Sequence, residues 1–510
     1  MSHTQNSPLV VFGLDAGDLD LIQRWVSEGY LPTIASIMKR GCWARTEGPE
    51  LISEHGVWVS LFSGISRAQH GYYYFRQLKP GTYDLETITG QDIDAPPFWA
   101  CLRGGEKKVA IIDVPDSRPL PGLQGVQLAN WATHNNWDPE NFPLMAEPPE
   151  LLREVRRNFG PQLVTVERHE STAEEDAEIY REVLDRIRKK GALCRYLLAR
   201  DRFDLAVIVF GESHLASHQF WKYHVDSLGK AENGDGQLTD AIRDVYQAID
   251  REVGHTLKQL PSDSNVFIVS SVGMEDDYPA TGLIQAFCRE LNYQMPQENG
   301  SFRPVDLARK VMPESWRIAL SRHLSRDKRE RLLADQFRHG TNWRKTTAFT
   351  IPAAYTSFVR VNLRGREPEG IVEPDAEYEA LLRRIQTDLE QLIDPKTKEP
   401  AVTRVLKTVE LFGCRPHPSL PDLFVEWKPG RFMERVIHPR AELVQKKPDF
   451  YRRSDHTAQG FVAAAGPSIR SSVHVNDVSV LALAPTFLSI MGEAIPQRMT
   501  GRVIEDMIGN

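Results

Sequence analysis

The feature that most constrains the fold is the alternation of short, wholly apolar runs with longer amphipathic stretches. Residues 9–14 read LVVFGL, and comparable runs recur at 107–115, 204–211 and 265–273. Apolar residues at helical spacing lie between them, for example at 238–260. A run that is apolar at nearly every position is typical of a strand buried on both faces. The sequence therefore predicts an α/β fold, with a doubly wound, mostly parallel central sheet and helices on both of its faces.

The length of 510 residues is compatible with several domains or with one large α/β domain that carries insertions. Strand and helix patterns continue along the chain without an internal repeat, which favours a single domain over residues 1–510. Residues 275–345 differ in character, and we expect them to form an inserted loop or cap segment. The basic stretch 314–340 is predicted to be a solvated amphipathic insertion, with a docking surface for an acidic partner as the alternative.

Charge and cysteine content exclude several classes of protein. The formal net charge is −7 and no stripe of lysine and arginine is evident, so nucleic acid is not expected as the main partner. The five cysteines form no CxxC motif, which argues against a disulfide framework and a thiolate zinc site. No apolar run approaches about 18 residues and no signal peptide is evident, so we expect a cytoplasmic protein without a membrane span. Nothing in the sequence specifies an oligomeric state.

The strongest local signal is a pair of histidines, His214 and His218, in the segment GESHLASHQFW. This segment directly follows the apolar run that ends near residue 211. Residues four apart lie on the same face of a helix, so both imidazoles can reach one metal ion. Such a pair can also be an ordinary surface or core pair. Its position nevertheless supports a metal site, because open α/β sheets bind ligands at the carboxyl ends of their strands.

Two further residues are candidates for the same site. Asp15 directly follows the first apolar run, where it can bind a metal or, alternatively, cap a helix or form an Asx turn. His456 precedes a later apolar run and is a candidate third imidazole, although alone it carries no signal. Because the carboxyl ends of parallel strands meet at one edge of a sheet, we expect Asp15 and His214 to share a site.

A hydroxyl and a carboxylate precede the helical pattern VWVSLFSG. Ser53 and Glu54 lie in the segment SEHGVWVS, and side chains near the free N–H groups of a helix start suit an anionic substrate. The alternative, which these residues alone favour, is that Ser53 caps the helix and Glu54 occupies its first turn. Both are candidate catalytic residues, and Glu54 is also a candidate metal ligand.

Taken together, these segments resemble the type I phosphodiesterase/nucleotide pyrophosphatase branch of the alkaline phosphatase superfamily. The resemblance runs in order along nearly the whole chain, from the opening strand and helix through FGESHLASHQFW, VFIVSSVGM, LPDLFVEW and HTAQGFVAAAGPSI to VSVLALAPTFLSIMG. Each motif is modest by itself, but their shared order makes the similarity specific. The resemblance implies an alkaline phosphatase-like fold and two metal ions, usually zinc. It also implies a Ser or Thr nucleophile that attacks a phosphate or sulfate ester in line.

The resemblance assigns metal ligands residue by residue. Asp15 matches the ligand at the end of the first strand. His218 matches the histidine of the family's Asp-x-x-x-His element, and His214 stands where that element has Asp. His456 matches the ligand of the final His…Gly segment. One metal position thus has three imidazoles, a set that suits zinc, with iron and manganese as alternatives.

The second metal position departs from the family pattern. Where the family has Ser-Asp-His-Gly, Ser271 and Val272 replace the carboxylate and the imidazole, and valine cannot bind a metal. The family's spacing places Glu54, with Ser53 adjacent, at the position of the nucleophile. The number of ions, one or two, and the role of Glu54 as nucleophile or ligand are therefore left open.

Three functions are compatible with these residues. The first is a metal-dependent hydrolase or transferase that acts on a small-molecule phosphate ester, with phosphodiesters slightly preferred over monoesters. The second is a binding or scaffold protein that has kept the fold and lost the chemistry, which Ser271 and Val272 motivate. The third is a non-hydrolytic metalloenzyme that uses a His-rich site. Metal content and turnover of phosphate esters distinguish the three.

Overall fold

The computed structural model describes residues 7–133, 141–168, 171–224, 238–276, 282–297, 326–353, 356–448, 451–471 and 473–509. Contacts within the chain divide it into two compact units. The first unit comprises residues 1–73, 89–277 and 449–510, and the second comprises residues 74–88 and 278–448. All of the candidate site residues belong to the first unit.

The first unit is built on a sheet that has ten strands within the described residues. The order is β19 (Val473–His474), β2 (Cys42–Glu47), β18 (Gly460–Ala465), β9 (Asn265–Ser270), β1 (Leu9–Leu14), β8 (Leu205–Phe210), β5 (Lys108–Ile112), β6 (Gln124–Ala129) and β7 (Met145–Glu147), with β20 (Val478–Ser479) paired to β2. The central strands β9, β1, β8, β5 and β6 are parallel, whereas β18 and β7 run antiparallel to their neighbours. The four apolar runs that predicted strands correspond to β1, β5, β8 and β9.

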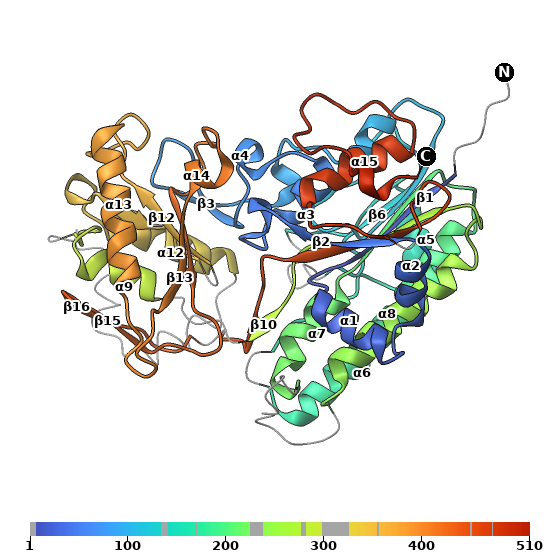
Figure 1. Cartoon of the computed structure of the whole chain (residues 1–510), viewed down its shortest axis with the longest axis horizontal. Helices are drawn as coiled ribbons and strands as arrows, with labels where there is room; N and C mark the ends of the chain where they lie inside the picture. The colour runs from blue at the N-terminus through green and yellow to red at the C-terminus, as the bar shows by residue number, and fades with distance from the viewer. Residues whose placement is uncertain are drawn as a thin grey trace. The chain divides into compact units, whose positions relative to one another are not determined.

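The strands β9, β1, β8 and β5 each contribute to two apolar cores. Along β1, Val10, Phe12 and Leu14 belong to one core, and Leu9 and Val11 belong to the other, because successive side chains of a strand point to opposite faces. Figure 1 shows helices on both faces. The first core is covered by α1 (Leu19–Ser27), α2 (Pro32–Arg40), α5 (Leu151–Phe159), α6 (Ala173–Leu198), α7 (Glu212–Phe220) and α8 (Ala241–Leu257), and the second by α3 (Val57–Ser63) and α15 (Leu483–Ile490). The predicted doubly wound α/β architecture is confirmed.

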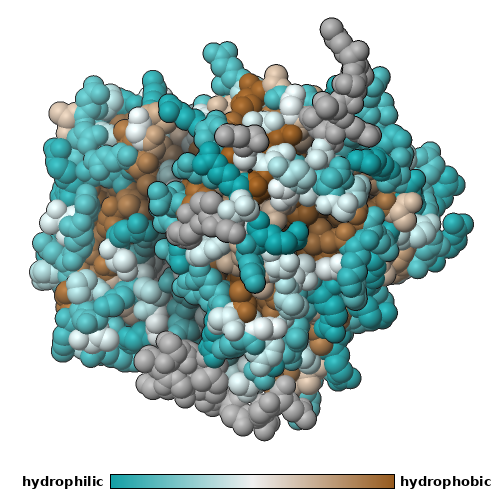
Figure 2. Space-filling view, turned by 45° about the vertical axis from the view of Figure 1, so that its right-hand side comes forward, coloured by the Kyte–Doolittle hydropathy of each residue, from teal (hydrophilic) through white to brown (hydrophobic). Residues whose placement is uncertain are grey.

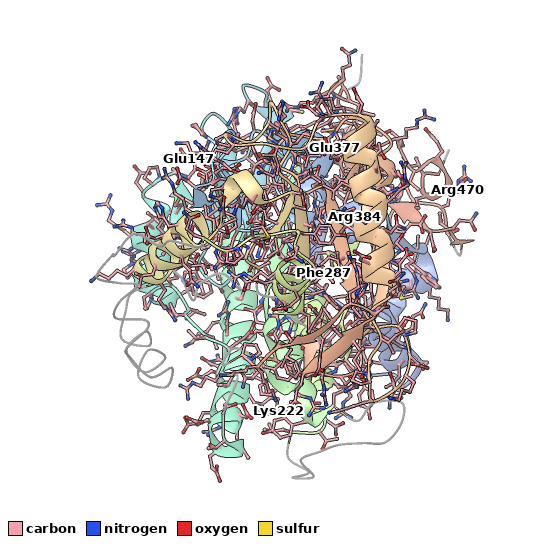
Figure 3. The ribbon with its side chains drawn as sticks, turned by 90° about the vertical axis from the view of Figure 1, so that its left-hand side faces the viewer. Glu147, Lys222, Phe287, Glu377, Arg384 and Arg470 are labelled. Atoms are coloured by element: carbon pink, nitrogen blue, oxygen red, sulfur yellow. The ribbon has the colours of Figure 1, made fainter. Side chains whose placement is uncertain are left out.

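The second unit has its own sheet and core. Its four-stranded antiparallel sheet has the order β11 (Ala348–Thr350), β12 (Ser357–Val361), β14 (Leu423–Trp427) and β13 (Val402–Lys407). Its core also includes side chains of α9 (Leu283–Glu290), α13 (Ala376–Glu390), β15 (Arg435–His438) and β16 (Ala441–Val444). Figure 3 labels Phe287 on α9, which is fully buried, and Arg384 on α13. The Cζ atom of Arg384 lies 5.0 Å from the ring centre of Tyr293.

The predicted insertion at 275–345 lies partly outside the described residues. The described part includes α12 (Arg326–His339), from the basic stretch 314–340. The second unit extends over 278–448 and also takes in 74–88. The expectation of a single domain with a cap segment stays a prediction.

The surface is mainly polar on the face that Figure 2 presents, with smaller hydrophobic areas among the hydrophilic side chains. Large hydrophobic residues exposed in the first unit include Val164, Val166 and Ile495. Scattered side chains of this kind are normal on protein surfaces. In the described parts of the chain, no helix combines the length and hydropathy that crossing a bilayer requires.

A buried ion pair fastens α6 to the carboxyl edge of the central sheet. Lys190 Nζ lies 3.2 Å from Asp113 Oδ2 and donates to the carbonyl of Ala132 at 3.0 Å. The Asp113 carboxylate accepts hydrogen bonds from the backbone N–H groups of Trp131 and Ala132 at 2.7 and 2.8 Å. Both charged side chains are fully buried. Because a buried charge without its partner is costly, this pair fixes how the turn after β6 packs.

Lys190→Met should destabilise the first unit by about 3 kcal/mol, because it leaves the Asp113 carboxylate buried without its counter-charge. Urea unfolding followed by circular dichroism measures the change. Lys189→Met is the matched control, since the side chains of Lys189 and of its partner Asp185 are both about half-exposed. That control should change stability by less than about 0.5 kcal/mol. Equal unfolding midpoints for the two variants would contradict the role given to the buried pair.

Candidate metal centre

Three imidazoles converge at the carboxyl edge of the central sheet. The ring centres of His214, His218 and His456 lie 4.7, 4.8 and 4.8 Å apart. One ligand atom from each lies within 4.8 Å of the other two. His218 and His456 are separated by 238 residues in the sequence. The structure thus brings together the three histidines, here called the triad, that the sequence analysis assigned to one site.

Helix α7 provides two of these histidines. It begins directly after β8, and all nine of its residues are buried. Its first residue, Glu212, accepts a hydrogen bond at 2.8 Å from Nε of the buried Arg186 on α6. This contact fixes the start of the helix. The spacing of four residues then places His214 and His218 on the same helical face.

The Nδ1 atoms of these two histidines are in contact with other side chains. His214 Nδ1 lies 3.2 Å from Asp15 Oδ2, and His218 Nδ1 lies 2.8 Å from Ser454 Oγ. A metal-binding histidine usually has such a partner on the ring nitrogen that does not bind the ion, because the partner fixes the orientation of the ring. This arrangement suits coordination through Nε2.

The spacing within the triad also suits a shared ion. His218 Nε2 and His456 Nε2 are 3.1 Å apart. Two nitrogens that bind one tetrahedral zinc ion at about 2.1 Å are separated by roughly 3.4 Å. Unlike those of His214 and His218, the Nδ1 atom of His456 is buried without a hydrogen-bond partner among the described residues, so the fit rests on the Nε2 spacing and on the donor set. The residues present therefore fit a divalent ion with nitrogen ligands.

Glu54 faces the triad. Its Oε2 lies 2.9 Å from His456 Nε2, and its Oε1 lies 3.4 Å from His55 Nδ1. Arg452 Nη2 is 3.7 Å from the same Oε2. Burial acts to raise the pKa of Glu54, but the charge of His456, its hydrogen bond, and the charges of His55 and Arg452 hold that pKa well below its usual value. An ionised carboxylate thus adds an oxygen donor beside the three imidazoles.

Ser53 is oriented differently. Its side chain is buried, and its hydroxyl donates to the carbonyl of Tyr73 at 2.8 Å. Helix α3 begins at Val57 with Gly56 as its N-cap, so the expectation that Ser53 caps this helix and Glu54 occupies its first turn is wrong. The reason is that Gly56 has a φ of 82°, a left-handed conformation that separates the preceding loop from the helix. The catalytic role of Ser53 stays a prediction.

Asp15 is in contact with three side chains. Its Oδ1 accepts hydrogen bonds from Trp58 Nε1 at 2.7 Å and from Ser271 Oγ at 3.1 Å, and its Oδ2 faces His214. The N-cap of the following helix α1 is Asp18, so the alternative that Asp15 caps this helix is wrong. These contacts orient the His214 ring. The role of Asp15 as a direct metal ligand stays a prediction.

Ser271 and Val272 contribute hydrogen bonding and packing at the end of β9. Ser271 Oγ donates to Asp15 and accepts from the backbone N–H of Ala16 at 3.1 Å. Val272 is buried in the core that α3 covers. These two residues therefore supply neither a carboxylate nor an imidazole to the site. Within the described ranges, the cluster able to hold a metal is the triad.

A buried network that the sequence analysis missed shapes the loop that carries Ser53 and Glu54. Arg67 Nη2 donates to the carbonyls of Glu50, Ser53 and His55 at 2.6, 2.8 and 2.8 Å. The Glu50 carboxylate accepts from the backbone N–H of Arg67 and from two serine hydroxyls. Burial lowers the pKa of Arg67 to about 10, although Glu50 opposes this shift. In the sequence, Glu50 and Arg67 are two charged residues among small and apolar ones. That pattern is too common to identify them as parts of a buried network.

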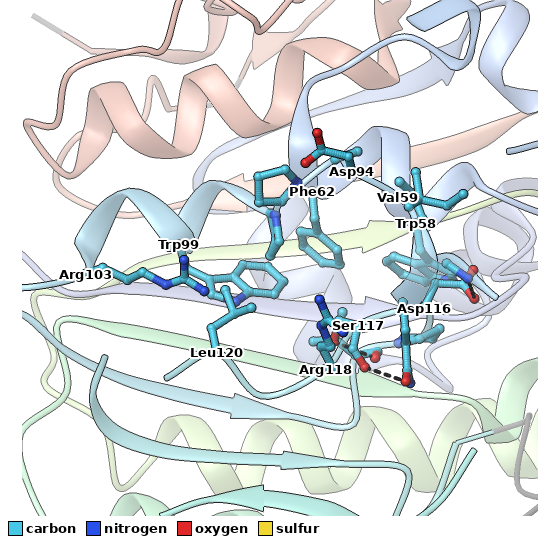
Figure 4. A pocket seen from close by; sticks show the side chains of 18 residues that line it. Trp58, Val59, Phe62, Asp94, Trp99, Arg103, Asp116, Ser117, Arg118 and Leu120 are labelled. Atoms are coloured by element: carbon cyan, nitrogen blue, oxygen red, sulfur yellow. Dashed lines mark hydrogen bonds between the residues drawn. The ribbon is translucent and has the colours of Figure 1, made fainter. Parts of the chain in front are cut away.

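A pocket of about 250 Å³ lies beside α3. Figure 4 shows Trp58, Phe62 and Trp99 among the side chains that line it. The rings of Trp58 and Phe62 are stacked with centres 5.4 Å apart, and Phe62 meets Trp99 edge to face at 5.2 Å. These ring contacts fix the orientation of the Trp58 indole. Because that indole donates a hydrogen bond to Asp15, they also help to hold the Asp15 carboxylate in place.

Comparison with models of known protein families shows the family of the chain. The model of the type I phosphodiesterase/nucleotide pyrophosphatase family matches residues 9–439. The chain belongs to this family. The resemblance inferred from the motifs is thereby confirmed, and family membership implies hydrolysis of phosphate esters. No match is found among curated proteins. Because the family match ends before His456, the place of that residue in the site rests on the geometry of the triad.

Ser454→Ala should weaken binding of Zn²⁺ about 10- to 100-fold, because it removes the hydroxyl that orients His218. Competition with a chromophoric chelator measures the affinity. Ser27→Ala is the control, since the Ser27 hydroxyl is exposed and bonds only within α1 in the described structure. Equal zinc affinity for the two variants would show that the contact does not support a metal site.

Proposed function

We propose that the protein is a metal-dependent hydrolase that cleaves small-molecule phosphate esters at a single divalent ion held by the triad. The observation that carries this proposal is the convergence of His214, His218 and His456, with Glu54 2.9 Å from His456 Nε2. Zinc is the proposed ion, because neutral imidazoles with a carboxylate form a typical zinc donor set. Iron and manganese are the alternatives that metal analysis tests.

A divalent ion bound at the triad supplies Lewis-acid activation of a phosphoryl oxygen and of a water molecule. The chain's own residues prepare the site for it. Asp15 and Ser454 hold two of the imidazole rings through their Nδ1 atoms. The clustering of buried aromatic residues around Trp58 limits the access of water to Asp15. Such fixed donors need little reorganisation when charge develops in the transition state.

Glu54 is proposed as the fourth ligand of this ion. Its Oε2 contacts the same Nε2 atom of His456 that faces His218, which places a carboxylate oxygen at the edge of the triad. The alternative is that the Glu54 carboxylate acts from the same position as a nucleophile: it displaces the alcohol of the ester to form an acyl phosphate, which water then hydrolyses to phosphate and the free carboxylate. Ser53 is the less favoured nucleophile, because its hydroxyl donates to a backbone carbonyl.

Phosphodiesters are proposed as slightly preferred substrates, in line with the family to which the chain belongs. A cytoplasmic location is proposed as well. It is supported by the five cysteines, which are all free thiols in the described structure, as a reducing compartment requires.

The purified protein should contain one zinc ion per chain and hydrolyse bis(4-nitrophenyl) phosphate faster than 4-nitrophenyl phosphate. Chelation should abolish turnover and added Zn²⁺ should restore it. His218→Ala should lose the ion and lower kcat/KM by about 1000-fold, because transition-state charge is no longer stabilised. His255→Ala, an exposed histidine of α8, is the matched control and should retain both properties. Metal-loaded protein that is inert toward both esters would refute the hydrolase.

Glu54→Gln separates the two roles of the carboxylate. If Glu54 is a ligand, as proposed, the variant should bind Zn²⁺ about 10- to 100-fold more weakly and regain part of its turnover at high zinc concentration. If it is the nucleophile, zinc affinity should stay unchanged while turnover is lost at every zinc concentration. Zinc titration of the variant, read by both affinity and rate, distinguishes the outcomes.

A second candidate function is binding of a phosphate ligand without turnover. The observation that favours it is that two candidate site residues are already hydrogen-bonded within the protein. Asp15 accepts hydrogen bonds from Trp58 and Ser271, and the Ser53 hydroxyl donates to the carbonyl of Tyr73. Tight binding of phosphate with no hydrolysis would identify this function. Iron in protein purified from its native source would instead favour non-hydrolytic metal chemistry.

A further inference from the structure

The pocket beside α3 is separate from the candidate metal centre. Its volume is about 250 Å³, and its lining includes neither Asp15, Glu54 nor a histidine of the triad. All of its lining residues belong to the first unit. Protein sites for drug-sized ligands usually have volumes of roughly 300 to 1,000 Å³. The pocket is therefore large enough for one small ring system and too small for a much larger molecule.

One wall of this pocket is aromatic. Trp58 and Phe62 lie one turn apart on α3, and their rings are nearly parallel, with an angle of 15° between their planes. Trp99, from the short helix η3 (Phe98–Leu102), meets Phe62 at 65°. Figure 4 shows the three side chains along the pocket. Because aromatic rings pack well in offset-stacked and edge-to-face arrangements, such a wall favours a ligand with a planar ring.

Hydrogen bonds between two loops fix another part of the lining. The backbone N–H of Gly90 donates to Asp116 Oδ1 at 3.3 Å, and Gln91 Nε2 donates to the carbonyl of Ser117 at 3.2 Å. A Cβ atom on Gly90 would lie 2.2 Å from Asp116 Cβ, so the two loops approach closely enough to require glycine. A pocket whose walls are fixed in this way loses little conformational entropy when a ligand binds.

Two arginines line the pocket without a carboxylate partner. Arg103 and Arg118 are exposed, and the side chain of neither forms a hydrogen bond or an ion pair with the described residues. The lining also includes two carboxylates. That of Asp116 accepts the Gly90 N–H, whereas that of Asp94 is exposed. The pocket thus has two guanidinium groups available to a ligand and one exposed carboxylate, which favours a ligand with negative charge.

We propose that this pocket binds a small aromatic carboxylate, at a site distinct from the triad. The planar ring of the ligand packs against the aromatic wall, and its carboxylate pairs with Arg103 and Arg118. A guanidinium matches the geometry of a carboxylate, and these two need not break an ion pair within the protein before they bind one. A cationic ring fits less well, because the two arginines repel it even though aromatic faces attract cations.

Naphthalene-2-carboxylate is the probe for this site, and isothermal titration calorimetry of the full-length protein is the measurement. One molecule should bind per chain. Acetate lacks the ring and naphthalene-2-methanol lacks the charge. Each should bind at least about 10-fold more weakly than the probe, because each keeps only one of the two kinds of contact.

Arg103→Gln and Arg118→Gln should each weaken binding of the probe about 10-fold, because each removes a charge-assisted hydrogen bond. Their melting temperatures should stay unchanged, since both side chains are exposed. Arg153→Gln is the matched control. It removes an exposed arginine of α5, a helix that covers the core on the other face of the sheet, and it should bind the probe as the wild type does.

His218→Ala should bind the probe with unchanged affinity, because the triad does not line the pocket. Loss of binding in this variant would place the anion at the metal centre and overturn the proposal. Acetate that binds as tightly as the probe would overturn it too, as would unchanged affinity in both pocket variants, Arg103→Gln and Arg118→Gln. Because these measurements use neither zinc nor turnover, their outcome is independent of whether the protein hydrolyses phosphate esters.

Discussion

The arrangement of the candidate site depends on the contacts of one buried group, the Asp15 carboxylate. It lies directly after β1, and its oxygens join Trp58 of α3, Ser271 after β9 and His214 of α7. Its backbone carbonyl also accepts a hydrogen bond from Ser213 Oγ at 2.6 Å. A carboxylate that is 3% exposed meets little competition from water, so each of these bonds has a strong directional effect. A single side chain thus sets the placement of three segments that are far apart in sequence.

The general fold and part of the site could be predicted because they depend on local patterns. Strands that are buried on both faces must be apolar at most positions, which made β1, β8 and β9 visible in the sequence. The paired imidazoles of α7 followed from the spacing of His214 and His218 and from their position after β8. The third imidazole, His456, could be assigned only through the family resemblance, because its approach depends on a pairing between β10 (Glu275–Asp276) and β17 (Ser454–Asp455) that has no local signal.

The parts of the site that depend on loop conformation could not be predicted. Whether Glu54 lies in a helix or faces the triad is decided by the left-handed Gly56 and by the carbonyl groups that Arg67 gathers. These are properties of the folded loop and not of its composition. Arg452 was missed for a similar reason, since a charged residue two positions before a short strand is ordinarily solvated.

The complete burial of α7 has a consequence for how this centre can diversify. All nine of its residues are packed, so exchanging a ligand on this helix also disturbs the core around it. Glu54 and His456 lie outside the helix, and both are partly exposed. We therefore expect substitutions that change the ion preference of the site to be tolerated more readily at Glu54 and His456 than at the two histidines of α7.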